Sequence, residues 1–202
     1  MGTTLAKIVS VILHPLLMPA LGLLIIFNSG TYLSYLPYES KKIIFMVVTL
    51  CTIIIPLSIL PFFLYHKLII SIQMNSRKER FIPLITGFLF YAFCYFLVRR
   101  FPIPASYHAF FLGTTIAVLC SLIISVIWKI SAHMVGIGGL TGLIVFLILS
   151  LRIDLQFLLI LAVISSGLIG FARLQLKVHE PAQVYSGFVA GFFSVGLTML
   201  LY

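Results

Sequence analysis

The sequence predicts an all-α, polytopic transmembrane helix bundle of about six to seven spans. Of its 202 residues, 62% are hydrophobic and only 8% are charged. The mean hydropathy of +1.23 exceeds what one soluble core of this size can bury. Seven spans of roughly 20 residues use about 140 residues, so the remainder suffices only for loops. We therefore expect a single transmembrane domain over residues 1–202.

Prolines interrupt the first two spans. The apolar run Ile8–Phe27 is too long for the hydrophobic region of a signal peptide, so we interpret it as a retained span. His14-Pro15 and Pro19 predict a kink or a short re-entrant piece near its start. His14 fits either a packed histidine or a functional group, and we favour packing, because an ionisable group within a span becomes a functional candidate only when a partner can be named. Two further prolines break the second run, residues 43–65.

The other spans are separated by short polar segments. We expect them over residues 81–98, 108–128, 140–151 and 155–171, and from residue 184 onward. Lys129–Gly139 is predicted to form a polar, glycine-rich hinge before the fifth span. In the last span, Gly187 and Gly191 have the spacing that lets two helices approach closely, which favours a packing role. A homodimer through this face stays open.

Three polar clusters, residues 77–80, 129–139 and 173–179, are separated from one another by two spans each. Since two crossings return the chain to the same side of the membrane, all three are predicted to lie at one face. The formal charge of +9 must sit at the membrane edges of so apolar a chain, where anionic lipid head groups are the natural partners. We expect no nucleic-acid partner. The positive-inside rule does not decide which side this face occupies, because the cluster cations themselves tip the count.

The residue types in these clusters favour phosphate chemistry. Arginine offers a planar, permanently charged set of donors that suits phosphate. His133 and His179 share the predicted face, and imidazole can act as nucleophile or general acid near neutral pH. The three cysteines fall in apolar runs without the spacing of a metal site, so we expect neither a metal nor another cofactor. The sequence thus predicts phosphoryl transfer on a phosphorylated lipid.

Two of the clusters also resemble signatures of the type-2 phosphatidic acid phosphatase (lipid phosphatase/haloperoxidase) superfamily. Ala172-Arg173-Leu-Gln-Leu-Lys-Val-His179, followed by Gln183, resembles the third signature: Ser-Arg, five residues, His, three residues, Asp. Ser131-Ala132-His133 resembles the second, Pro-Ser-Gly-His. The likeness is to small bacterial members of the inner (cytoplasmic) membrane, and its motifs span about half of the chain. It implies metal-free hydrolysis of a phospholipid phosphate or an isoprenoid phosphate or diphosphate.

The resemblance also implies a role for each matching residue. His133 would protonate the leaving group, His179 would form a phosphohistidine, and Gln183 would take the place of the Asp that orients this histidine. Arg173 and the Ser131 hydroxyl would bind phosphate. The first signature, Lys, six residues, Arg-Pro, is met only loosely, and it adds further candidate phosphate ligands: Arg77, Lys78 and Arg80.

Gln183 leaves a second class of function open. Its amide can accept a hydrogen bond but brings no negative charge to stabilise an imidazolium, although Glu180 is a conceivable substitute. The alternative is therefore a catalytically impaired relative that binds anionic lipid or a partner membrane protein. A transporter or channel ranks last, because it would need polar residues through the bilayer midplane, and the predicted spans hold few.

Overall fold

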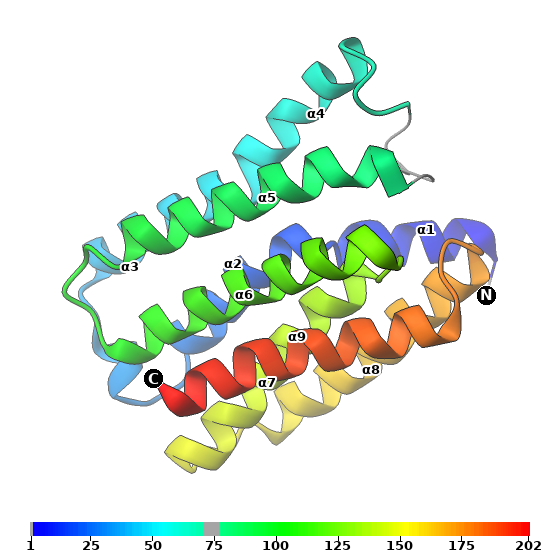
Figure 1. Ribbon diagram of the computed structural model, residues 1–202. Helices are drawn as coiled ribbons and strands as arrows, with labels where there is room; N and C mark the ends of the chain where they lie inside the picture. The colour runs from blue at the N-terminus through cyan, green and yellow to red at the C-terminus, as the bar shows by residue number, and fades with distance from the viewer. Residues whose placement is uncertain (1, 71–76) are drawn as a thin grey trace.

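The computed structural model describes residues 2–70 and 77–202, except for the side chains of Arg77, Lys78 and Arg80. The described chain folds into seven helical segments that are long and apolar enough to cross a membrane (Figure 1). The predicted all-α bundle is thereby confirmed, and the protein is a multi-pass helical membrane protein. Its helices are α1 (Thr3–Ile12), α2 (Met18–Phe27), α3 (Tyr38–Thr49), α4 (Ile55–Tyr65), α5 (Arg77–Val98), α6 (Ala105–Ile127), α7 (Ala132–Leu151), α8 (Gln156–Gln175) and α9 (Pro181–Leu201). Three shorter turns complete the described elements: η1 (Pro15–Leu17), η2 (Tyr32–Tyr35) and the π-helical η3 (Leu50–Ile54).

The first span is broken where the sequence predicted. The last backbone bond of α1 runs from the Leu13 N–H to the Val9 carbonyl, at 3.0 Å. Pro15 lacks an N–H and disfavours helical backbone at the preceding residue. His14 is accordingly extended, with φ −69° and ψ 139°. Because the helix stops there, the next carbonyl in order, that of Ser10, does not receive a helical N–H.

The second span also bends. Pro56 follows the π-helical turn η3, and Pro61 lies inside α4. A π turn ahead of a proline accommodates the missing N–H at the cost of a local bulge. The segments α3 and η3 pack against α5, whereas α4 leans away from the rest of the bundle (Figure 1). Helix α4 therefore lies at the edge of the bundle, whereas η3 still contacts η1 of the first span.

Helices α7 and α9 form the tightest contact of the bundle. In α7, 61% of the spanning window is buried, against 33% or less in the other candidate spans. A Cβ at Gly191 would overlap the Val135 carbonyl oxygen, and one at Gly187 would lie 2.8 Å from the Ser131 carbonyl oxygen. The predicted packing role of these two glycines is confirmed. Their face is used within the chain and is not open to a second copy.

The predicted hinge at Lys129–Gly139 is wrong. Helix α7 begins at Ala132, so the glycine run lies within its first turns. Glycine disfavours an isolated helix, but here it permits close packing. A Cβ at Gly136 would lie 3.2 Å from Pro15 Cα, and one at Gly138 would overlap the Phe188 carbonyl oxygen. Helices α8 and α9 likewise extend beyond their expected ends toward each other.

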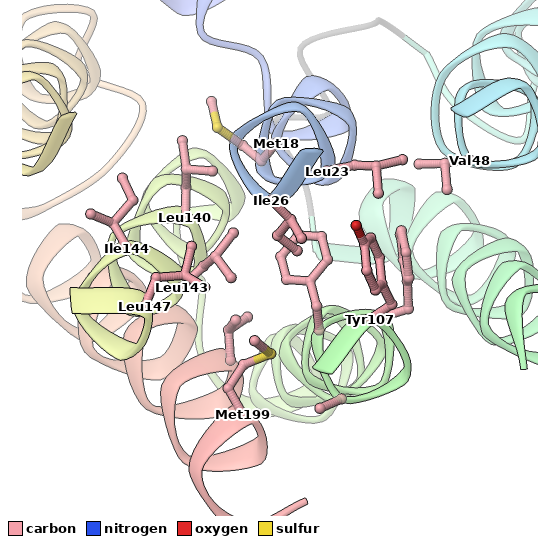
Figure 2. Packing of buried hydrophobic residues seen from close by; sticks show 14 of the residues in the cluster. Met18, Leu23, Ile26, Val48, Tyr107, Leu140, Leu143, Ile144, Leu147 and Met199 are labelled. Atoms are coloured by element: carbon pink, nitrogen blue, oxygen red, sulfur yellow. The ribbon is translucent and has the colours of Figure 1, made fainter. Parts of the chain in front are cut away.

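Large apolar side chains fill the interior beside this contact. In Figure 2, Ile26 of α2, Tyr107 of α6 and Leu143 of α7 point into one cluster, and all three are fully buried. The Tyr107 hydroxyl finds an acceptor in the Leu33 carbonyl. The cluster ties the first, fourth, fifth and seventh spans together, so that their ends are held in a fixed arrangement.

The connectors that carry the polar clusters lie at one end of the bundle. In Figure 1 the amino terminus, the start of α5, the α6–α7 connector and the α8–α9 connector are all at this end, with the carboxyl terminus at the other. A backbone bond of 3.3 Å from the Ser131 N–H to the Gln183 carbonyl joins the second cluster to the first turn of α9, directly after the third cluster. The parity argument from the sequence is confirmed.

Candidate functional site

The α8–α9 connector is a tight reversal that brings Arg173 and His179 to neighbouring helix ends. Arg173 lies in the last turn of α8. The Val178 N–H bonds to the Arg173 carbonyl at 3.3 Å, and the Lys177 N–H to the Leu174 carbonyl at 2.9 Å. With Lys177 in the left-handed region at φ 53°, this is a Schellman cap. The cap occupies most of the five residues between the arginine and the histidine, which explains why the spacing suits a shared site.

His179 is held by the first turn of α9. Its Nδ1 lies 3.0 Å from Gln183 Oε1, and both side chains are buried. The same oxygen accepts the Glu180 N–H at 3.3 Å, and the Glu180 side chain accepts the Gln183 N–H in return, which completes a capping box. A backbone N–H can only donate, so the shared amide atom is the oxygen. His179 Nδ1 therefore carries the proton, and in the neutral ring Nε2 holds a lone pair.

His133 is fixed in the opposite tautomer. It lies in the first turn of α7, half-buried, with Nε2 3.0 Å from the Ser10 carbonyl oxygen. A carbonyl can only accept, so Nε2 carries the proton and Nδ1 has the lone pair. Ser10 offers this carbonyl because the break at Pro15 denies it a helical donor. The first span thus determines which nitrogen of His133 carries the proton and which holds the lone pair.

His14 lies against His133. The two rings meet edge to face, with centroids 5.2 Å apart. His14 Nδ1 accepts the Leu16 N–H at 3.3 Å, so His14 caps η1. The Arg173 guanidinium interacts electrostatically with both rings, and His179 interacts with His133. Three histidines and an arginine therefore lie together. They come from the first span (His14), the start of α7 (His133), the end of α8 (Arg173) and the α8–α9 connector (His179).

The structure places the predicted residues unequally. His133, Arg173, His179 and Gln183 come together as described above. Ser131 lies beside them, but its side chain is fully buried, and within the described residues its hydroxyl has no hydrogen-bond partner. Its role as a phosphate ligand stays a prediction.

The candidates of the first cluster stay predictions too. Helix α5 begins at Arg77, at the same end of the bundle, but the side chains of Arg77, Lys78 and Arg80 lie outside the described residues.

Sequence reasoning missed Ser10 and favoured a packing role for His14. The only signal was Pro15, since a helix broken by proline leaves carbonyls without donors. A search of the described residues finds no group of three His, Cys, Asp or Glu side chains arranged to hold a metal ion.

No known family model, curated protein or solved structure matches this chain. The fold and the site define it as a seven-span helical membrane protein with a histidine–arginine cluster at one end of the bundle.

Proposed function

We propose that this protein is a membrane-embedded phosphatase that hydrolyses a lipid or isoprenoid phosphate or diphosphate through a phosphohistidine at His179, without a metal. We place it in a bacterial cytoplasmic membrane, as the resemblance of its motifs to the type-2 phosphatidic acid phosphatase superfamily implies. Arg173, His133 and His179 carry that resemblance and lie together in space.

One observation supports the proposal above the others: the Gln183 oxygen is shared between the Glu180 N–H and His179 Nδ1. This arrangement leaves Nε2 unprotonated, the state that a nucleophilic imidazole needs. It also bears on the main departure from the family pattern, which is Gln183 in place of the Asp of the third signature. An amide in place of the expected carboxylate still orients the ring and fixes its tautomer, although it adds no charge.

In the first step, His179 Nε2 attacks the phosphorus while Arg173 binds the non-bridging oxygens. The bond from phosphorus to the lipid oxygen breaks, and its electron pair stays with that oxygen. His133, which takes up a proton from solvent at Nδ1 when the anionic phosphate binds, gives this proton to the leaving oxygen. Its Nε2–H stays hydrogen-bonded to the Ser10 carbonyl, so Nδ1 is the nitrogen that exchanges protons.

In the second step, water attacks the phosphohistidine. His133 Nδ1, now unprotonated, accepts a proton from this water as the new oxygen–phosphorus bond forms. The phosphorus–Nε2 bond breaks and returns its electron pair to His179. Inorganic phosphate leaves, and His133 returns to its neutral form as the Nδ1 proton passes back to solvent. The two histidines act in sequence as nucleophile and as acid then base.

The deciding experiment measures phosphate release by the detergent-purified protein. The substrates are phosphatidic acid, phosphatidylglycerol phosphate and undecaprenyl diphosphate, each supplied with a chelator. We expect release from at least one substrate, and we expect the His179→Ala variant to lose it. Acid-labile, base-stable labelling of the wild-type protein by a radiolabelled substrate would mark the phosphohistidine.

Lys177→Ala is the matched control, because Lys177 is an exposed cation of the same connector. It should change the rate by less than about twofold, as exposed charges contribute little. Equal losses of phosphate release in His179→Ala and Lys177→Ala would indicate a general electrostatic effect and would contradict a specific catalytic role for His179. Loss of activity on adding chelator would overturn the metal-free mechanism.

A second function is favoured by the neutral Gln183 side chain beside His179. In this alternative, the missing negative charge makes the site inactive. The protein then binds anionic lipid through Arg173 and performs no chemistry. This reading predicts no release from any substrate, while labelled phosphatidic acid still binds and loses affinity in the Arg173→Ala variant.

A further inference from the structure

We propose that His14 is a further phosphate-binding residue, which donates from its Nε2–H to a non-bridging phosphoryl oxygen. This inference rests on the proposed function, because it adds a third histidine to the same site. It makes the first span part of the binding site.

The position of His14 is set by packing against α7. Pro15, directly after it, lies against Gly136, where a Cβ would be 3.2 Å from Pro15 Cα. His133 is three residues before Gly136, on the same face of α7. The span break is thus wedged beside His133 and holds the two rings in edge-to-face contact at 5.2 Å.

The backbone also determines what His14 can offer a ligand. Its Nδ1 is occupied by the Leu16 N–H, a donor, so a neutral ring carries its proton on Nε2. Nε2 has no hydrogen-bond partner in the described part of the chain, and the side chain is half-buried. The site therefore holds a histidine with a committed acceptor and a donor left for a ligand.

The neighbouring groups indicate which ligand this donor serves. His133 presents an unprotonated Nδ1, and Arg173 presents a cationic guanidinium that acts on both rings. A donor beside a cation matches an anionic oxygen, and a hydrogen bond to a charged acceptor is stronger than one between neutral groups. A phosphoryl group bound by Arg173 has more than one such oxygen, and His14 binds one of them.

Two substitutions separate phosphate binding from helix capping. In His14→Asn the amide oxygen can replace Nδ1 as the cap, since Asn is a strong N-cap residue, but the distal donor is lost. In His14→Gln the amide nitrogen reaches the position of Nε2 and keeps that donor, but the cap is lost. The measurements are KM and kcat with phosphatidic acid, the inhibition constant of inorganic phosphate, and the thermal midpoint.

We expect His14→Asn to raise both KM and the phosphate inhibition constant about tenfold, with kcat changed less than about threefold and the midpoint unchanged. His14→Gln should stay within about threefold of wild type in KM, even where its midpoint falls. The reverse pattern, rescue by Asn and loss with Gln, would overturn the proposal and leave His14 a capping residue.

His108→Asn serves as the control, because His108 lies in the first turn of α6 at the other end of the bundle. A wild-type protein that releases phosphate, together with a His14→Asn variant indistinguishable from it, would refute this inference alone. A wild-type protein that releases none would refute the proposed function instead, and the phosphate affinity of the two variants would still test His14 as a ligand.

Discussion

His133 and His179 face the same site but are held by different means. His133 bonds to a backbone carbonyl in the first span, that of Ser10, whereas His179 bonds to the Gln183 side chain four residues ahead of it. The first arrangement depends on a distant element and on where a helix stops. The second is local and is encoded within one helix turn.

The difference matters for what each ring can do. In the neutral rings, the bond to the backbone carbonyl leaves the lone pair of His133 on Nδ1, and the bond to the amide leaves that of His179 on Nε2. In the proposed mechanism, the nucleophile and the proton carrier therefore present different nitrogens to one substrate. The distance between the two rings is set by the contact between α7 and α9, because each ring lies at the start of one of these helices. It is not set by the hydrogen bonds to the Ser10 carbonyl and to Gln183.

The largest effect is expected from breaking that contact. In Gly191→Ala the new Cβ would overlap the Val135 carbonyl oxygen, and backbone cannot rotate away as a side chain can. Overpacking of this kind costs about 1–3 kcal/mol or more. We expect a clear fall in the thermal midpoint of the detergent-purified protein, together with loss of phosphate release. Gly167→Ala, where a Cβ would meet nothing within 4 Å, should leave both unchanged. Equal midpoints for the two variants would contradict this account of the packing.

The next largest effect is expected from removing the hydrogen bond between His179 and Gln183. Gln183→Leu removes the acceptor for His179 Nδ1 and one half of the capping box, so the tautomer is no longer fixed. We expect turnover to fall at least about a hundredfold, since loss of a histidine-orienting group is severe in other enzymes. Gln183→Glu keeps the side-chain length, preserves the capping box and adds the missing charge. It should raise kcat about tenfold, and more than the shorter Gln183→Asp does. A fall in kcat with Glu would show that the charge is not what limits the rate.

Much of the fold follows from the sequence because membrane spans are long, apolar and separated by polar residues. Where the prediction of the hinge at Lys129–Gly139 failed, the cause was tertiary: glycines that weaken an isolated helix are here required by the close approach of α9. Helix ends were misplaced for a related reason. Arg173 and Gln183 are polar and read as loop residues, yet they belong to helix end turns, where the Arg173 carbonyl and the Gln183 side chain take part in the caps.

The site was predictable where the motif was local. The spacing from Arg173 to His179 and on to Gln183 fits within one reversal and one helix turn, so a sequence pattern can describe it. The parity of the spans added His133. Ser10 and His14 were beyond such reasoning, because their contacts with His133 depend on how the first span packs against α7. Only Pro15 hinted that a free carbonyl would be available there.

The smallest effect is expected from changing the hydrogen bond between His133 and the Ser10 carbonyl of the first span. Pro15→Ala removes the cause of the break, so α1 can continue and the His14 N–H can compete with His133 for the Ser10 carbonyl. We expect kcat to fall several-fold, by less than about tenfold, while the thermal midpoint stays the same or rises. The effect should be smaller than that of Gln183→Leu, because packing against α7 still favours the broken span. Pro19→Ala is the control, since Pro19 lies in the first turn of α2, where proline is tolerated and bonds to neither ring. If both variants lost the same fraction of kcat, the loss would belong to the span as a whole, and the Ser10 carbonyl would not be what sets the tautomer of His133.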